Sequence, residues 1–174
     1  MLLLVRHAMP DANPDRPPET WPLSTDGRAA AQALVATLPH DAHRVSSAEP
    51  KAWETLGGAA NGVVRDGRLN EISRVGEPWG ADFLELRRRY VRGEQHPGWE
   101  PRAQAAGRFE AAVNDARVAA GQRPVAIATH GMVMTVWLLA RGMIGPDEAG
   151  GFWADLRFPD CLALPADGPP RRYP

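Results

Sequence analysis

Two short apolar runs, each followed closely by a histidine, constrain the fold of this chain more than any other feature. Leu2–Arg6 is rich in branched residues and leads into His7, whereas residues 125–128 lead through Thr129 into His130 and a helical segment. Short runs that are apolar throughout are typical of strands buried on both faces of a parallel sheet. We therefore expect both histidines at the carboxyl ends of such strands.

The rest of the chain continues the alternation of strands and helices. Helices are expected over residues 28–38 with Ser24 as cap, 49–60, 81–92, 102–120 and 132–141, and strands over 43–47, 63–65, 153–158 and 161–164, the last two as a terminal hairpin. Such an order predicts an α/β fold. We expect a three-layer α/β/α sandwich whose mostly parallel central sheet has about six strands, with helices on both faces.

The length and charge of the chain restrict its organisation and partners. A length of 174 residues without repeats or a dividing linker predicts one domain, residues 1–174. The 20 basic and 21 acidic residues nearly cancel, so we expect neither nucleic acid nor a membrane surface as a partner. Cys161 is the only cysteine, which excludes an internal disulfide and a multi-thiolate zinc site.

The apolar runs are also too short to target or anchor the chain. The N-terminal run has no basic residue before it and meets Arg6 at once, unlike a secretory signal. The longest other run, residues 132–140, is far below the roughly 20 residues of a spanning helix. These features, together with the single cysteine, predict a cytoplasmic protein.

The residues at the two strand ends suit phosphate chemistry. Ligands of open α/β sheets bind at this edge, and the N–H groups of the helix that begins after His130 favour an anion. The guanidinium of Arg6 binds phosphate oxygens and disfavours a proton on His7, so a neutral ring nitrogen could attack phosphorus. Two histidines with an acid could instead hold a metal ion, although the neighbouring arginine would repel a cation.

The same residues resemble the signature of the histidine phosphatase superfamily, the phosphoglycerate mutase-like family, which has R-H-G near its N-terminus. This chain has Leu4-Val5-Arg6-His7-Ala8 there. The resemblance continues in order through nearly the whole chain, at Asn13, PLSTDG (22–27), SSAEPKAWET (46–55), LNE (69–71) and THGMV (129–133).

The resemblance implies a covalent phosphatase mechanism without a metal or cofactor. His7 would attack the phosphoryl group of a small phosphomonoester or a phosphopeptide, and water would then hydrolyse the phosphohistidine. Arg6, Lys51 and His130 would clamp the phosphate, and Glu71 would act as general acid and base. Asn13 would touch the phosphate or shape its loop, although its place in a Pro-rich loop suits a plain turn residue nearly as well.

The chain departs from the family pattern at two positions. Ala8 replaces the signature glycine, which removes easy access to a positive φ beside His7. Lys51 stands where the family usually has arginine, so a point charge replaces a planar fork of donors. These departures leave two alternatives open beside hydrolysis: a mutase, for which 174 residues is short, and a catalytically weak relative that binds phosphate or phosphoproteins. The substrate and the oligomeric state are not predicted.

Overall fold

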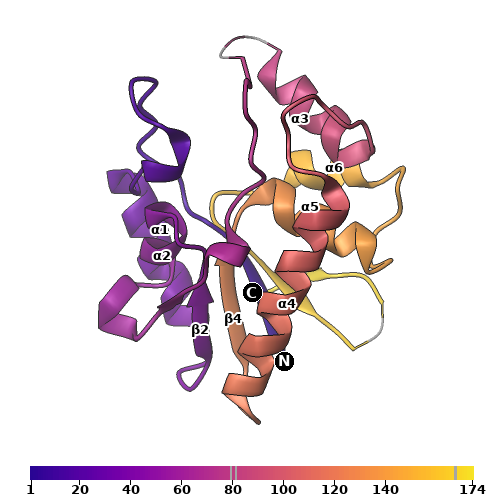
Figure 1. The fold of residues 1–174 in the computed structure, drawn as a ribbon. Coiled ribbons are helices and arrows are strands. Elements are labelled where there is room, and N and C mark those ends of the chain that lie inside the picture. Colours follow the sequence, from indigo (N-terminus) through magenta and orange to yellow (C-terminus); the bar gives the residue numbers. More distant parts are fainter. Residues whose placement is uncertain (79, 81, 167) are drawn as a thin grey trace.

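The fold is built on one six-stranded sheet, seen here in a computed structural model that describes residues 1–78, 80, 82–166 and 168–174 (Figure 1). The strands are β1 (Leu2–Arg6), β2 (His43–Ser46), β3 (Val64–Arg65), β4 (Val125–Thr129), β5 (Asp160–Leu164) and β6 (Arg171–Arg172). Their order is β3-β2-β4-β1-β5-β6. The first four in that order run parallel, and β5 and β6 each run antiparallel to the preceding neighbour.

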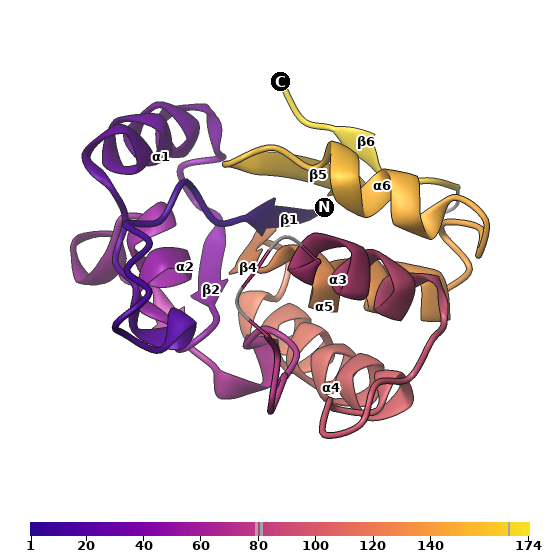
Figure 2. The ribbon, with the colours of Figure 1, turned by 90° about the horizontal axis from the view of Figure 1, so that it is seen from above.

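Helices cover both faces of this sheet, which confirms the predicted three-layer architecture. The helices are α1 (Thr25–Thr37), α2 (Pro50–Thr55), α3 (Phe83–Arg92), α4 (Arg102–Ala120), α5 (Gly131–Ala140) and α6 (Ala149–Asp155). Figure 2 shows α1 and α2 on one side of the sheet and the other four on the opposite side. None of the helices in the described part of the chain is long and apolar enough to cross a membrane.

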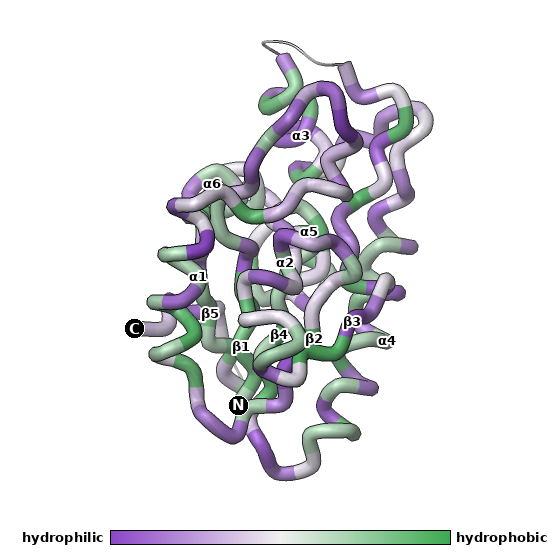
Figure 3. The backbone as a smooth tube through the Cα atoms, turned by 90° about the vertical axis from the view of Figure 1, so that its left-hand side faces the viewer, coloured by the Kyte–Doolittle hydropathy of each residue, from purple (hydrophilic) through white to green (hydrophobic). Residues whose placement is uncertain are grey.

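The central strands divide their side chains between two hydrophobic clusters. Leu2 and Leu4 of β1 pack into the cluster with α4 and α5, whereas Leu3 and Val5 pack into the cluster with α2. This alternation follows from the two-residue period of a strand. The tube in Figure 3 is mostly green along these central strands, in line with burial on both faces.

Helix α1 starts as the sequence predicts, and its start is tied to the loop that follows β1. The Oγ of Ser24 accepts a hydrogen bond from the N–H of Gly27 at 3.0 Å, which caps the helix. The N–H of Ser24 donates to the carbonyl oxygen of Met9 at 3.0 Å. The start of α1 therefore holds the loop that leaves His7.

Two expected elements differ in the structure. The helix expected over residues 49–60 stops at Thr55, because Gly57 and Gly58 have φ values of 89° and 59° and start a separate 3₁₀ turn, Gly58–Asn61. The expected hairpin of 153–158 with 161–164 is wrong. Trp153 belongs to α6, and β5 pairs with β1 on one side and β6 on the other. The strand β1 is therefore an interior strand, and the short β6 near the end of the chain forms this edge of the sheet.

The close approach of Gly27 to the Met9 carbonyl generates a stability prediction. A Cβ at position 27 would lie 2.0 Å from the Met9 oxygen, whereas a Cβ at the helical Gly107 would meet nothing within 4 Å. We expect Gly27→Ala to lower the free energy of unfolding by about 1–3 kcal/mol. Gly107→Ala is the matched control and should raise it by about 0.5–1 kcal/mol. Urea denaturation of both variants checks this, and equal effects would contradict the close approach.

Candidate active site

The pairing of β1 with β4 brings the two strand-end histidines together. Arg6 lies opposite Thr129 in the parallel register, so His7 and His130 leave the sheet side by side. The N–H of His7 donates to the Thr129 carbonyl at 3.0 Å, and the centroids of the two imidazole rings are 5.1 Å apart. The site thus begins where two neighbouring strands end.

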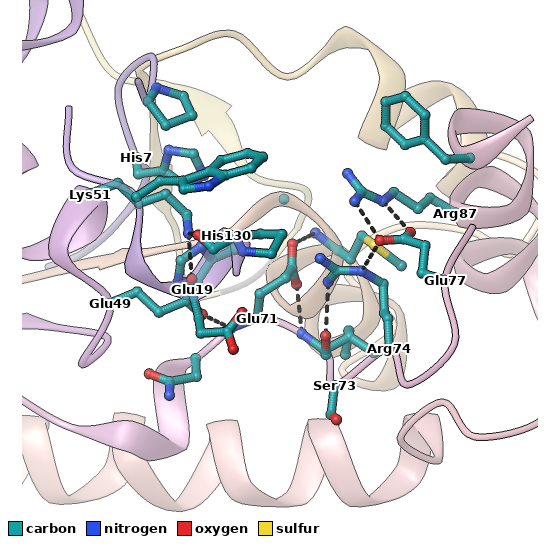
Figure 4. A pocket seen from close by; sticks show the side chains of 18 of the residues that line it. His7, Glu19, Glu49, Lys51, Glu71, Ser73, Arg74, Glu77, Arg87 and His130 are labelled. Carbon is teal, nitrogen blue, oxygen red and sulfur yellow. Dashed lines mark hydrogen bonds and ion pairs between the residues drawn. The ribbon is translucent and has the colours of Figure 1, made fainter. Parts of the chain in front are cut away.

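A cavity of about 550 Å³ opens beside these rings. Figure 4 shows His7, Lys51 and His130 at one end of this pocket, Arg87 at the other end, and Glu71 between them. The charged side chains in its lining come from β1, the loop before α1, the start of α2, the segment after β3, and α3: Arg6, Glu19, Glu49, Lys51, Glu71, Arg74, Glu77 and Arg87. Every sequence-predicted site residue except Asn13 therefore lines one cavity.

The geometry of His7 leaves its Nε2 as the ring nitrogen without a hydrogen. Its Nδ1 is 2.7 Å from the carbonyl oxygen of Ala8, and because that oxygen can only accept, Nδ1 carries the hydrogen. Burial, followed by the charges of His130 and Lys51, lowers the pKa of His7 well below its ordinary value. The neutral ring therefore presents an unprotonated Nε2 at neutral pH.

Ala8 fits its place without a positive φ. Its side chain is fully buried, its N–H donates to Oγ1 of Thr55 at 2.9 Å, and its carbonyl holds His7. Positive φ values in the described chain occur at glycines. The replacement of the signature glycine therefore does not misplace His7.

Arg6 is held by a backbone carbonyl and by an aromatic ring. Its Nη1 donates to the Leu156 carbonyl at 2.6 Å, and its guanidinium carbon lies 3.5 Å from the ring centroid of Phe158. Burial lowers the pKa of Arg6 to about 10, partly offset by Glu71 and Asp160, so the side chain remains a cation at neutral pH. Its buried Nε has no hydrogen-bond partner among the described residues.

His130 is held by one of its two ring nitrogens. Nε2 lies 2.7 Å from the Oγ of Ser47 and 3.3 Å from Oε1 of Glu49. Within the described chain, the buried Nδ1 has no partner. Burial, and next the positive charge of Lys51, lowers the pKa of His130 well below its ordinary value, so this ring is also neutral in the free protein.

Glu71 occupies the anion-binding start of α5. Its carboxylate accepts hydrogen bonds from the N–H groups of Ile72 and Val133, both at 2.9 Å, and of Met132 at 3.1 Å. Free N–H groups and the positive end of the helix dipole favour a negative charge there. The sequence predicts an anion at this helix start, and in the structure that anion is a carboxylate of the chain itself.

Lys51 lines the pocket, but it does so as one half of an ion pair that the sequence analysis missed. Its Nζ lies 2.5 Å from Oε2 of Glu49 and donates to the Pro18 carbonyl at 2.7 Å. Only 7% of the Lys51 side chain and 6% of the Glu49 side chain are exposed. The sequence feature that could have indicated this ion pair is an acid two residues before Lys51, followed by a proline that starts α2.

A second missed group forms the far wall of the pocket. Glu77 accepts two hydrogen bonds from Arg87, at 2.6 and 2.7 Å, and one from Arg74 at 3.0 Å. Two of these residues precede α3 and the third lies on it, in a run of three arginines. Their meeting depends on how the segment after β3 folds back, which no spacing in the sequence encodes.

Two other candidates do not join the pocket. The Oδ1 of Asn13 accepts a hydrogen bond from the N–H of Asp15 at 2.9 Å, as expected for a turn residue. Asn13 is not among the residues that line the pocket. Trp99 is buried and packs against Tyr90 and His96, as a core residue would. The sequence also allows Trp79 and Trp99 as aromatic walls of a substrate pocket, but Trp79 lies outside the described residues. No group of three or more His, Cys, Asp or Glu side chains that could hold a metal ion occurs within the described ranges.

The sequence as a whole matches the model of the histidine phosphatase superfamily (branch 1) over residues 2–154. This chain belongs to that superfamily. No curated protein matches it significantly. Among solved structures, Bacillus stearothermophilus YhfR is similar with a TM-score of 0.70 at 19% identity, over 98% of this chain and 94% of that one. A mycobacterial glucosyl-3-phosphoglycerate phosphatase gives 0.66 at 24% identity, over 92% and 87%.

The neutrality of the two buried histidines generates a pH prediction for this superfamily member. Because their pKa values are lowered in the folded protein, the unfolded chain binds these protons first as pH falls through about 6.5. We expect ¹⁵N NMR to show both rings neutral at about pH 6. The free energy of unfolding should fall as pH drops below about 6.5. An imidazolium at His7 at that pH would contradict the assigned geometry.

Proposed function

We propose that this chain is a phosphomonoester hydrolase that works through a phosphohistidine on Nε2 of His7. The observation that carries the proposal is the neutral His7 ring, whose Nδ1–H is bonded to the Ala8 carbonyl and whose Nε2 is left unprotonated in the pocket beside Arg6. Superfamily membership supports the same chemistry. A cavity of about 550 Å³ suits a small molecule better than an extended peptide.

In the first step, His7 Nε2 forms a bond to phosphorus while the bond from phosphorus to the leaving oxygen breaks. Arg6, Lys51 and His130 surround the phosphoryl oxygens. Glu71, ionised in the free protein, takes a proton from the monoanionic form of the phosphomonoester as this substrate binds, and gives it to the leaving oxygen. Since both Glu71 oxygens already accept backbone hydrogen bonds, this transfer uses one of their remaining lone pairs.

In the second step, a water molecule replaces the leaving group. Glu71, now ionised, takes a proton from this water as its oxygen attacks phosphorus. The bond between phosphorus and Nε2 breaks, Glu71 passes the proton from the water to the inorganic phosphate that leaves, and His7 and Glu71 return to their starting states. Each proton and electron pair is therefore accounted for without a cofactor.

Phosphate binding without efficient turnover is a second candidate, favoured by the pairing of Lys51 with Glu49. The carboxylate offsets the charge that a phosphate dianion would meet at this position. Release of p-nitrophenolate from p-nitrophenyl phosphate separates the two candidates. A panel of phosphorylated metabolites and phosphopeptides would then define the substrate, and it should include glucosyl-3-phosphoglycerate, named for one of the similar structures.

The nucleophile assignment predicts a trapped phosphoenzyme. Rapid quench with ³²P-labelled substrate should label the protein through a bond that is stable in base and lost in acid. His7→Ala should abolish the label and lower kcat by orders of magnitude, because a covalent nucleophile has no substitute. His40→Ala, at an exposed loop histidine, is the control. Labelling that persists in His7→Ala would refute the assignment.

The role of Glu71 predicts a dependence on the leaving group. Glu71→Gln cannot transfer a proton, so kcat should fall by roughly 10²–10⁴ for an alkyl phosphate. The loss should be much smaller for p-nitrophenyl phosphate, whose leaving group needs no proton. Steady-state kinetics on both substrates checks this. Equal losses would show that Gln disturbs the start of α5 instead of removing an acid.

A further inference from the structure

Glu49 contacts three groups that the proposed reaction uses. Its Oε2 pairs with Nζ of Lys51, and its Oε1 accepts from the N–H of Glu71 at 2.9 Å. The same Oε1 lies 3.3 Å from Nε2 of His130. Glu49 is only 5% exposed, so solvent does not screen these contacts. A buried carboxylate beside a phosphate site needs a reason, because it repels the anion that the site binds.

The contact with His130 selects one form of its ring. A carboxylate can only accept, so a bare Nε2 facing Glu49 would place two lone pairs against each other. The hydrogen of the neutral ring therefore lies on Nε2, where the Oγ of Ser47 accepts it and the carboxylate of Glu49, 3.3 Å from Nε2, attracts it. Nδ1 is then bare, and it is the ring nitrogen without a partner among the described residues. It can donate to a phosphoryl oxygen only after it gains a proton.

The charges of the pocket also leave a phosphate dianion unbalanced. In the described lining, the carboxylates of Glu19, Glu49, Glu71 and Glu77 face the cations of Arg6, Lys51, Arg74 and Arg87. With both histidines neutral, these charges cancel. A dianion entering this pocket would therefore favour uptake of a positive charge close to the phosphorus atom.

We propose that Glu49 is a positioning residue that fixes the Nε2–H of His130, so that Nδ1 takes up one proton from solvent when a phosphoryl dianion binds. The resulting imidazolium lies between two negative groups, Glu49 at Nε2 and the dianion at Nδ1. The inference rests on the phosphate site of the proposed function, but it does not require turnover.

The other charged groups around His130 set the direction of this change. They face it from β1, α2, the segment after β3 and α4: Arg6, His7, Lys51, Glu71, Arg74 and Arg108. Lys51, Arg74 and Arg108 disfavour a proton on the ring, whereas Glu71 favours it. Since burial also disfavours the charged ring, the proton is absent before the anion arrives.

Tungstate is a suitable probe, because it is a tetrahedral dianion that carries no proton of its own near neutral pH. Calorimetric titration of the wild-type protein in buffers with different ionisation enthalpies should show uptake of about one proton per tungstate bound. The affinity should weaken by up to roughly tenfold per pH unit as pH rises above the pKa of His130 in the complex. Wild-type binding without proton uptake, or no tungstate binding, would overturn the inference.

Matched variants separate the Glu49 contact from the charge of the pocket. Glu49→Gln should reduce proton uptake at neutral pH to near zero. Glu19→Gln removes the same charge from the lining without a contact to His130, and Glu54→Gln makes the same change on α2 outside the pocket. Both controls should keep most of the proton uptake. An equal loss in Glu49→Gln and Glu19→Gln would show that only net charge matters.

The wild-type protein alone also decides the inference, should Glu49→Gln not fold. ¹⁵N NMR should find hydrogen on Nε2 of His130 in the free protein and on both nitrogens with tungstate. Hydrogen on Nδ1 in the free protein would overturn the inference. Proton uptake without any hydrolysis of phosphomonoesters would refute the proposed function and leave this inference standing. Hydrolysis without proton uptake would refute this inference and leave the proposed function standing.

Discussion

The parallel pairing of β1 with β4 is the interaction on which the site depends. It sets Arg6 opposite Thr129, and the bond from the His7 N–H to the Thr129 carbonyl extends the pairing by one residue. Both histidines then leave the sheet at the same level, with their rings 5.1 Å apart. A slip of one residue would send their side chains to opposite faces of the sheet. The buried core of both strands prevents that slip.

In the pocket built on this pairing, the charged side chains are already bonded to other groups of the chain before any substrate enters. Glu71 holds the start of α5, Glu49 holds Lys51, and Glu77 holds Arg74 and Arg87. Such pairing keeps buried cations in place, and it also reduces the attraction that an anion meets. The chemistry we propose therefore relies on the position of neutral histidines more than on an excess of positive charge.

Much of the frame of this site follows from local sequence. The apolar runs before His7 and His130 predict buried strands, and Ser24 predicts the start of α1, because these signals act over a few residues. The prediction that Lys51 and Glu71 belong to the site rests on the resemblance to a family. The partners of those residues could not be predicted, since Glu49 meets His130 across 81 positions of the chain. The sequence predicts a strand at Trp153, which lies in α6, because a short apolar segment does not distinguish a strand from a helix.

A crystal structure with vanadate tests the central claim most directly. Vanadate adopts the five-coordinate geometry of a phosphoryl group in transfer, so it reports which atom attacks. Our account predicts a bond from vanadium to Nε2 of His7, with Arg6 and His130 against the equatorial oxygens and Nδ1 of His7 still on the Ala8 carbonyl. Vanadate bound to another side chain, or held in the pocket without a bond to His7, would contradict it.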